Sequence, residues 1–169
     1  MSTEPTGEYS LPVKRVTGDT LEDRLTANAY QNILPARYLK QDAEGNLVED
    51  QEDLFVRVAR NIALAEAPYE ATKRDTELTV RPEQVKPDHA RRDELIAEVF
   101  GAGTTVDDDA ETALTPKNVN KFAYETVVPE LPEEIRAHVE GLATEYEELM
   151  STLSFMPNSP TLMNAGDEL

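Results

Sequence analysis

The chain has 169 residues, a length that suits one domain with a buried core. Aspartate and glutamate number 34 against 16 lysines and arginines, which gives a formal net charge of −18. A surface this acidic repels nucleic acids and anionic membranes, so we expect neither as a partner. Arginines outnumber lysines ten to six. An acidic, lysine-poor composition is typical of proteins that stay soluble in concentrated salt, where screening weakens self-repulsion.

Several site classes are excluded by composition. The sequence has no cysteine, so no disulfide, cysteine metal site or thiol chemistry lies within it. His89 and His138 fall in no spaced ligand pattern, and we expect no metal site. Residues 1–9 show no leader pattern, and no stretch approaches the roughly 20 apolar residues of a membrane span. We therefore expect a cytoplasmic protein, and the helical spacing of its apolar residues predicts one that is mainly α-helical.

The first part of the chain predicts a polar start and then helices. Residues 1–10 are polar, so we expect them to be disordered. Residues 11–153 have the pattern of one helical domain, which opens with a short helix within 21–34. Pro35 should interrupt that helix, because proline lacks the N–H that a helix interior requires. A turn around a Gly-Asn pair is expected at 42–47.

Two helices are predicted in the middle of the chain. The first spans 51–66, with Asp50 as a suitable N-cap. Its apolar side chains recur on one face: Leu54, Phe55, Val58, Ala59 and Ile62. Pro68 should close this helix. The second helix spans 88–100, and Gly101 should stop it by adopting a left-handed conformation.

The next segments predict a loop and two further helices. Residues 101–114 combine glycines with acidic side chains and indicate a surface loop. The consecutive aspartates 107–109 point apart, so they do not make a calcium loop. A helix is expected over 116–127, and the longest one over 132–153. The apolar residues of the longest helix alternate at spacings of four and three: Ile135, Val139, Leu142, Tyr146, Leu149 and Leu153.

The last segment has an unusual pattern. Residues 155–166 read FMPNSPTLMNAG, which is neither a helical pattern nor a simple alternating strand. Ser159 and Thr161 flank Pro160, which fixes the backbone angle between them. Their hydroxyls, with the free N–H groups of an irregular loop, could hold an anion such as phosphate. The residues alone also allow a plainer interpretation, a Ser/Thr turn before a short apolar strand.

Two segments resemble the ribonucleotide reductase family. One is FMPNSPTLMNAG, which is similar to the strand and loop that open the catalytic barrel, most of all in the adenosylcobalamin-dependent (class II) enzymes. The other, residues 25–66, is similar to the helical N-terminal domain of the family and reads LTANAYQNILPARYLKQDAEGNLVEDQEDLFVRVARNIALAE. The two occur in the family's order. With the acidic composition, the resemblance indicates a reductase from a halophilic archaeon.

The resemblance implies an architecture and an activity. A helical lead domain over 11–153 would precede a ten-stranded α/β barrel, of which residues 154–169 would be the first strand and loop. The complete enzyme would reduce ribonucleotides to deoxyribonucleotides by radical chemistry, with adenosylcobalamin as cofactor and a thioredoxin-type reductant. Thr161 matches the position that hydrogen-bonds the substrate's phosphates, and Ser159 beside it is a weaker candidate.

The catalytic residues are not among those that the resemblance covers. The sequence stops before the family's first redox cysteine, so no catalytic residue is assigned. We expect this segment alone to be inactive and to bind no cobalamin, and we expect the remainder of the reductase to be its partner. We also expect residues 154–169 to exchange amide hydrogens rapidly in the isolated chain, because a lone barrel strand has unpaired edges.

Two alternatives remain open. The large subunit of a class I reductase, which uses a separate metal-radical subunit, carries related motifs. A free-standing acidic helical protein without catalysis would instead bind a partner through the apolar stripe of residues 135–153.

Overall fold

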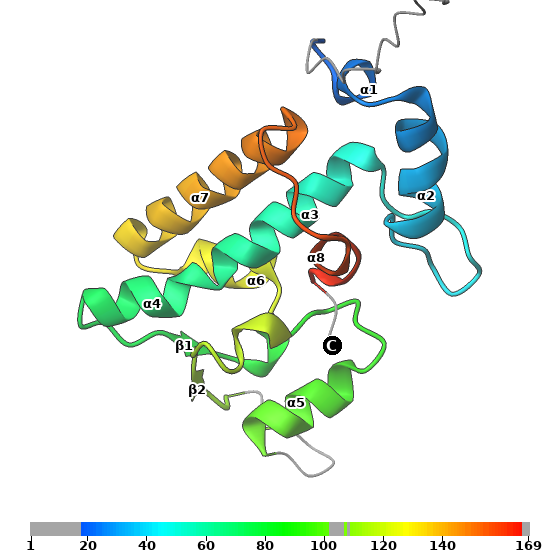
Figure 1. Ribbon diagram of the computed structural model, residues 1–169. Coiled ribbons are helices and arrows are strands. Elements are labelled where there is room, and N and C mark those ends of the chain that lie inside the picture. The colour runs from blue at the N-terminus through cyan, green and yellow to red at the C-terminus, as the bar shows by residue number, and fades with distance from the viewer. Residues whose placement is uncertain (1–17, 102–106, 108, 167–169) are drawn as a thin grey trace, which may run out of the picture.

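The computed structural model describes residues 18–101, 107 and 109–166, and these form a mainly helical structure (Figure 1). The two longest helices, α3 and α7, run side by side. The expected disordered start at 1–10 lies outside the described residues. The elements in chain order are α1 (Leu21–Arg24), a π-helical turn η1 (Ala29–Ile33), α2 (Leu34–Arg37), α3 (Gln51–Leu64), α4 (Glu66–Lys73), β1 (Thr79–Val80), the 3-10 turn η2 (Pro82–Gln84), α5 (Arg92–Phe100), β2 (Thr112–Ala113), the 3-10 turn η3 (Val119–Lys121), α6 (Tyr124–Val127), the 3-10 turn η4 (Val128–Glu130), α7 (Glu133–Ser151) and α8 (Ser159–Asn164).

Helix α3 follows the sequence pattern closely. Asp50 accepts the backbone N–H of Asp53 at 2.8 Å, and the Asp53 carboxylate accepts the N–H of Asp50 in return. This capping box satisfies N–H groups that have no partner inside the helix. The predicted apolar face is buried except at Ile62, which is partly buried. The predicted helix and its cap are therefore confirmed.

The prolines do not end helices where we expected. Pro68 was expected to close α3, but it lies in the first turn of α4, which follows α3 after a single residue, Ala65. Pro35 likewise lies in the first turn of α2 and does not interrupt the helical run that η1 begins. Both predictions were wrong for one reason: the first N–H groups of a helix have no partner within it, so proline is tolerated there.

Helix α7 confirms the longest predicted helix, but near its C-terminal end the buried residues differ from those predicted. Ile135 and Val139 are fully buried, and Leu142 and Tyr146 pack partly against the core. Near the C-terminal end, however, Met150 is buried while Leu149 is 37% exposed. Because most of this stripe packs inside the molecule, it is not an open face for a partner.

The core has two clusters of buried side chains, and α3 and α7 contribute to both. One cluster gathers the last two residues of α3, Ala63 and Leu64, with α4, α5, α6 and most of α7. The other gathers the preceding part of α3, from Leu54 to Ala59, with α1, α2, α8 and Met150. Tyr146 packs against both clusters. No helix in the described part of the chain is long and apolar enough to cross a membrane.

The middle of the chain differs from the expected loop and helix. Thr112–Ala113, inside the predicted loop 101–114, forms β2 and pairs antiparallel with β1. Over 116–127 the structure has η3 and the short α6 instead of one helix. Helix α5 starts at Arg92, later than predicted, but it ends as predicted, because Gly101 adopts a left-handed φ of 67°.

The C-terminal segment was expected to be a barrel strand and is a helix. Helix α8 spans Ser159–Asn164. The sheet within the described residues has two strands, β1 and β2, and does not include this segment. Asn158 caps α8 by accepting the backbone N–H of Thr161 at 3.2 Å, and Pro160 lies in the first turn. A strand needs a neighbouring strand for its backbone groups, whereas this cap and proline are the signals that begin a helix.

Candidate functional site

Helix α8 carries both residues that the sequence singled out, and it packs on α3 (Figure 1). Leu162 and Ala165 face the core and are 6% and 9% exposed. Ser159 and Thr161 lie in the first turn, where Ser159 is exposed and Thr161 is half-buried. The helix therefore presents two hydroxyls near the surface while its apolar side fixes it to α3.

The Thr161 hydroxyl is engaged by the helix cap. It donates to Asn158 Oδ1 at 2.8 Å, and the same oxygen accepts the Thr161 N–H at 3.2 Å. A hydroxyl has a single proton to donate. To donate to a phosphate oxygen, Thr161 must therefore give up its bond to Asn158.

The Ser159 hydroxyl has a different partner. Its oxygen lies 2.8 Å from the hydroxyl oxygen of Tyr38, and either group can donate. When Tyr38 donates, the Ser159 proton is free for a phosphate oxygen. In this geometry the Ser159 hydroxyl can donate to a phosphate more readily than the Thr161 hydroxyl. The resemblance ranked these two residues the other way.

Tyr38 is a site residue that the sequence analysis missed. It lies within residues 25–66, which carry the resemblance to the family. It is 121 positions from Ser159 in the chain, and no local spacing rule connects residues so far apart.

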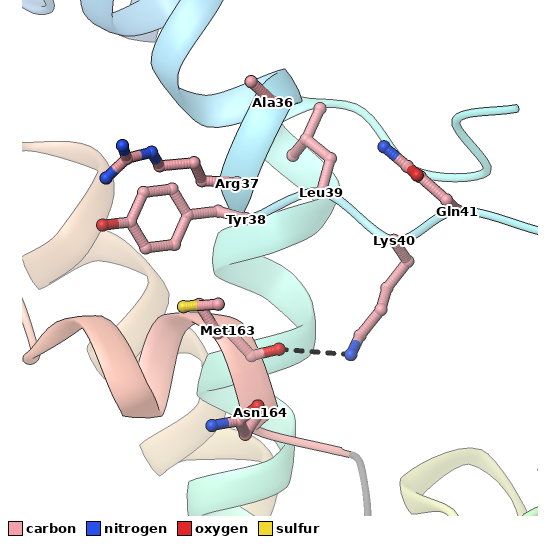
Figure 2. Close-up of a pocket in the computed structure, with 8 residues that line it drawn as sticks. All are labelled: Ala36, Arg37, Tyr38, Leu39, Lys40, Gln41, Met163 and Asn164. Carbon is pink, nitrogen blue, oxygen red and sulfur yellow. Dashed lines mark hydrogen bonds between the residues drawn. The ribbon is translucent and has the colours of Figure 1, made fainter. Parts of the chain in front are cut away.

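Two cations hold the other end of α8. Lys40 Nζ donates to the carbonyl of Met163 at 3.2 Å, the bond drawn in Figure 2. Arg57 Nη1 on α3 donates to the carbonyl of Ala165 at 2.6 Å. The last carbonyls of a helix have no partner within it and carry a partial negative charge, so cations stabilise this end.

An open depression of about 320 Å³ lies between the segment after α2 and the end of α8 (Figure 2). Arg37 and Tyr38 extend along one side and Lys40 and Gln41 along the other. The lining residues are Ala36, Arg37, Tyr38, Leu39, Lys40, Gln41, Met163 and Asn164. This depression is therefore open to water.

A second charged cluster joins α4 to α7. Glu70, only 8% exposed, pairs with Lys73 at 3.1 Å and Arg74 at 2.9 Å, and His138 Nε2 lies 3.9 Å away. The hydrogen bond from Lys73, followed by that from Arg74, lowers the pKa of Glu70 below its usual value. Each of these charges has a partner within the cluster, so we interpret it as structural.

Comparison with known proteins identifies the family. Residues 23–169 match the family model described as "Ribonucleotide reductase, all-alpha domain". The chain belongs to the ribonucleotide reductase family. This confirms the family expected from the sequence and its mainly helical lead domain.

One relative of this reductase segment is the vitamin B12-dependent ribonucleoside-diphosphate reductase of Thermoplasma acidophilum. The two are 29% identical over 165 residues, an alignment that covers 92% of this chain and 19% of the relative. The chain thus spans about a fifth of the length of the curated relative that it matches. No solved structure matches it.

Proposed function

We propose that this chain is the N-terminal segment of an adenosylcobalamin-dependent ribonucleotide reductase, which supplies deoxyribonucleotides for DNA synthesis by radical reduction of ribonucleotides. The observation that carries the proposal is the match of residues 23–169 to the all-alpha domain, joined to a relative named as B12-dependent. That relative is named as a diphosphate reductase, so ribonucleoside diphosphates are the first substrates to test. The acidic, lysine-poor composition supports a halophilic archaeal source.

Within the complete enzyme, α8 would contact the substrate's phosphates. Ser159 would donate its hydroxyl proton while it accepts from Tyr38. Thr161 would join after turning away from Asn158. Hydrogen bonds to charged groups contribute about 1.5–3 kcal/mol each, so the two hydroxyls together would support binding without taking part in the chemistry.

The residues of this segment do not fit the cobalamin itself. Histidine is the side chain here best suited to a cobalt ion. His89 Nδ1 already accepts the backbone N–H of Arg91 at 3.1 Å, and His138 faces Glu70. We therefore assign no step through cobalamin to these residues, and we propose that the cofactor and a thioredoxin-type reductant act on the rest of the enzyme.

A reconstitution assay tests the proposal. The chain would be combined with a polypeptide that supplies the barrel of the reductase, with adenosylcobalamin, a dithiol reductant and ribonucleoside diphosphates. We expect deoxyribonucleotide from the combination and none from this chain alone. Product from this chain alone, or none from the combination, would contradict the proposal. Activity that needs a metal-radical subunit and no cobalamin would favour the class I alternative.

A further inference from the structure

Arg57 makes an unusual number of contacts for one side chain of α3. Its Nε and Nη2 atoms each donate to one carboxylate oxygen of Glu49 at 2.8 Å. Nη1 donates to the carbonyl of Ala165 at 2.6 Å, and Nη2 also approaches the carbonyls of Leu162 at 3.3 Å and Tyr38 at 3.2 Å. One guanidinium thus joins α3, the end of α2 and the end of α8.

The Arg57–Glu49 pair is shielded from solvent. The side chains are 17% and 9% exposed, so their charges are largely withdrawn from water. A buried charge is tolerated when its partner and its remaining hydrogen bonds are all in place. Glu49 holds the guanidinium plane on one side, which directs the remaining donors at the carbonyls of α8.

Helix α8 depends on such contacts for its shape. It has six residues, far fewer than an isolated helix needs to be stable in water. Arg57 binds the carbonyls of Leu162 and Ala165, which lie at the C-terminal end of α8. Gly166 follows with a φ of 91°. The Cγ and Cδ atoms of Arg57 lie 3.6 Å from the position that a Cβ on Gly166 would occupy. Arg57 therefore contacts both the C-terminal end of α8 and the Gly166 turn that follows it.

We infer that Arg57 is the positioning residue that holds α8, and with it Ser159 and Thr161, in place on the helical domain. The inference deepens the proposed function, since positioning matters to catalysis only if α8 faces the substrate. The retention of α8 by Arg57 is, however, a property of this chain alone and is tested without activity.

Amide hydrogen exchange of the full chain tests the retention. In Arg57→Gln we expect the amides of Leu162 and Ala165 to exchange about tenfold to hundredfold faster, the factor for losing one charge-assisted hydrogen bond. Core amides such as that of Val139 should keep their rates. Arg60→Gln is the matched control, because Arg60 lies exposed on the same helix and packs on Tyr124 instead, 5.4 Å from its ring.

The outcomes separate positioning from general destabilisation. Unchanged exchange at α8 in Arg57→Gln would overturn the inference. If Arg57→Gln loses protection throughout, Arg57→Lys decides: faster exchange at α8 alone supports the inference, and wild-type protection there overturns it. In the reconstituted reductase, Arg57→Gln should raise the KM for the nucleotide with little change in kcat, while Arg60→Gln changes neither. A wild-type reconstitution without activity would overturn the proposed function and leave the exchange result standing.

Discussion

At the scale of the residue, one amide oxygen determines how the two candidate hydroxyls can act. Asn158 Oδ1 accepts both the N–H and the hydroxyl proton of Thr161. The resemblance ranks Thr161 first, but the helix cap uses its proton. Ser159 shares its hydroxyl with Tyr38 and keeps a proton available when Tyr38 donates. The geometry therefore ranks Ser159 above Thr161 as a phosphate donor in the resting state.

This ranking gives a prediction for the reconstituted enzyme. Ser159→Ala should raise the KM for the nucleotide about tenfold, because it removes one hydrogen bond to a charged group. Thr161→Val should have a smaller effect, since its proton must first leave Asn158. Steady-state kinetics of both variants, with the exposed Thr144→Val on α7 as control, measure the difference. A larger effect of Thr161→Val would restore the ranking from resemblance.

At the scale of the element, charged side chains fix α4 against α7. Glu70 on α4 binds Lys73 and Arg74 and faces His138 on α7. Arg74 also pairs with Glu134 at the start of α7. The contacts on Glu70 favour its ionised form, so its pKa lies below the usual 4.5 in the folded protein. The junction between these helices should therefore be sensitive to acid.

The sign of that sensitivity follows from linkage. A carboxyl group with a lowered folded pKa stabilises the protein above its unfolded pKa, and this contribution is lost as the pH falls through the folded value. Glu70→Gln should be less stable near neutral pH and should lose less of its stability on acidification below about 4.5. Urea unfolding midpoints of both proteins, measured from neutral pH to below about pH 4.5, give this difference in acid sensitivity. Equal acid sensitivity in Glu70→Gln and wild type would refute this prediction. The control is Glu147→Gln, which removes an exposed carboxylate of α7.

At the scale of the whole molecule, two long helices join two core clusters. Phe55 on α3 lies in the cluster with α8, and Ile135 on α7 lies in the other; each is 1% exposed. Because α3 and α7 both pass through the two clusters, the loss of one cluster removes support from the other. The described residues should therefore unfold as one cooperative unit.

Substitutions in the two clusters test this cooperativity. Phe55→Ala should cost about 3–5 kcal/mol and Ile135→Ala about 2–5 kcal/mol of unfolding free energy. Both should shift a single transition that is the same by far-ultraviolet circular dichroism and by tyrosine fluorescence, as the chain has no tryptophan. Two separate transitions, with each variant moving only one of them, would show that the clusters unfold independently.

The structure also removes the basis for expecting fast exchange over residues 154–169. That expectation assumed a lone strand with unpaired edges. Residues 159–164 instead form a capped helix, with Leu162 buried and its end bound by Arg57 and Lys40. We now expect α8 to be protected in the wild-type chain.

The sequence by itself determined the family and the two central helices, because their signals are local. The cap at Asp50, the apolar face of α3, the long period of α7 and the stop at Gly101 all act within a few residues of chain. Only the tertiary structure decided that α8 is a helix, that β2 pairs with β1 and that Ser159 meets Tyr38. A six-residue helix and a two-residue strand have too few local interactions to be stable alone, so contacts from distant parts of the chain determine both.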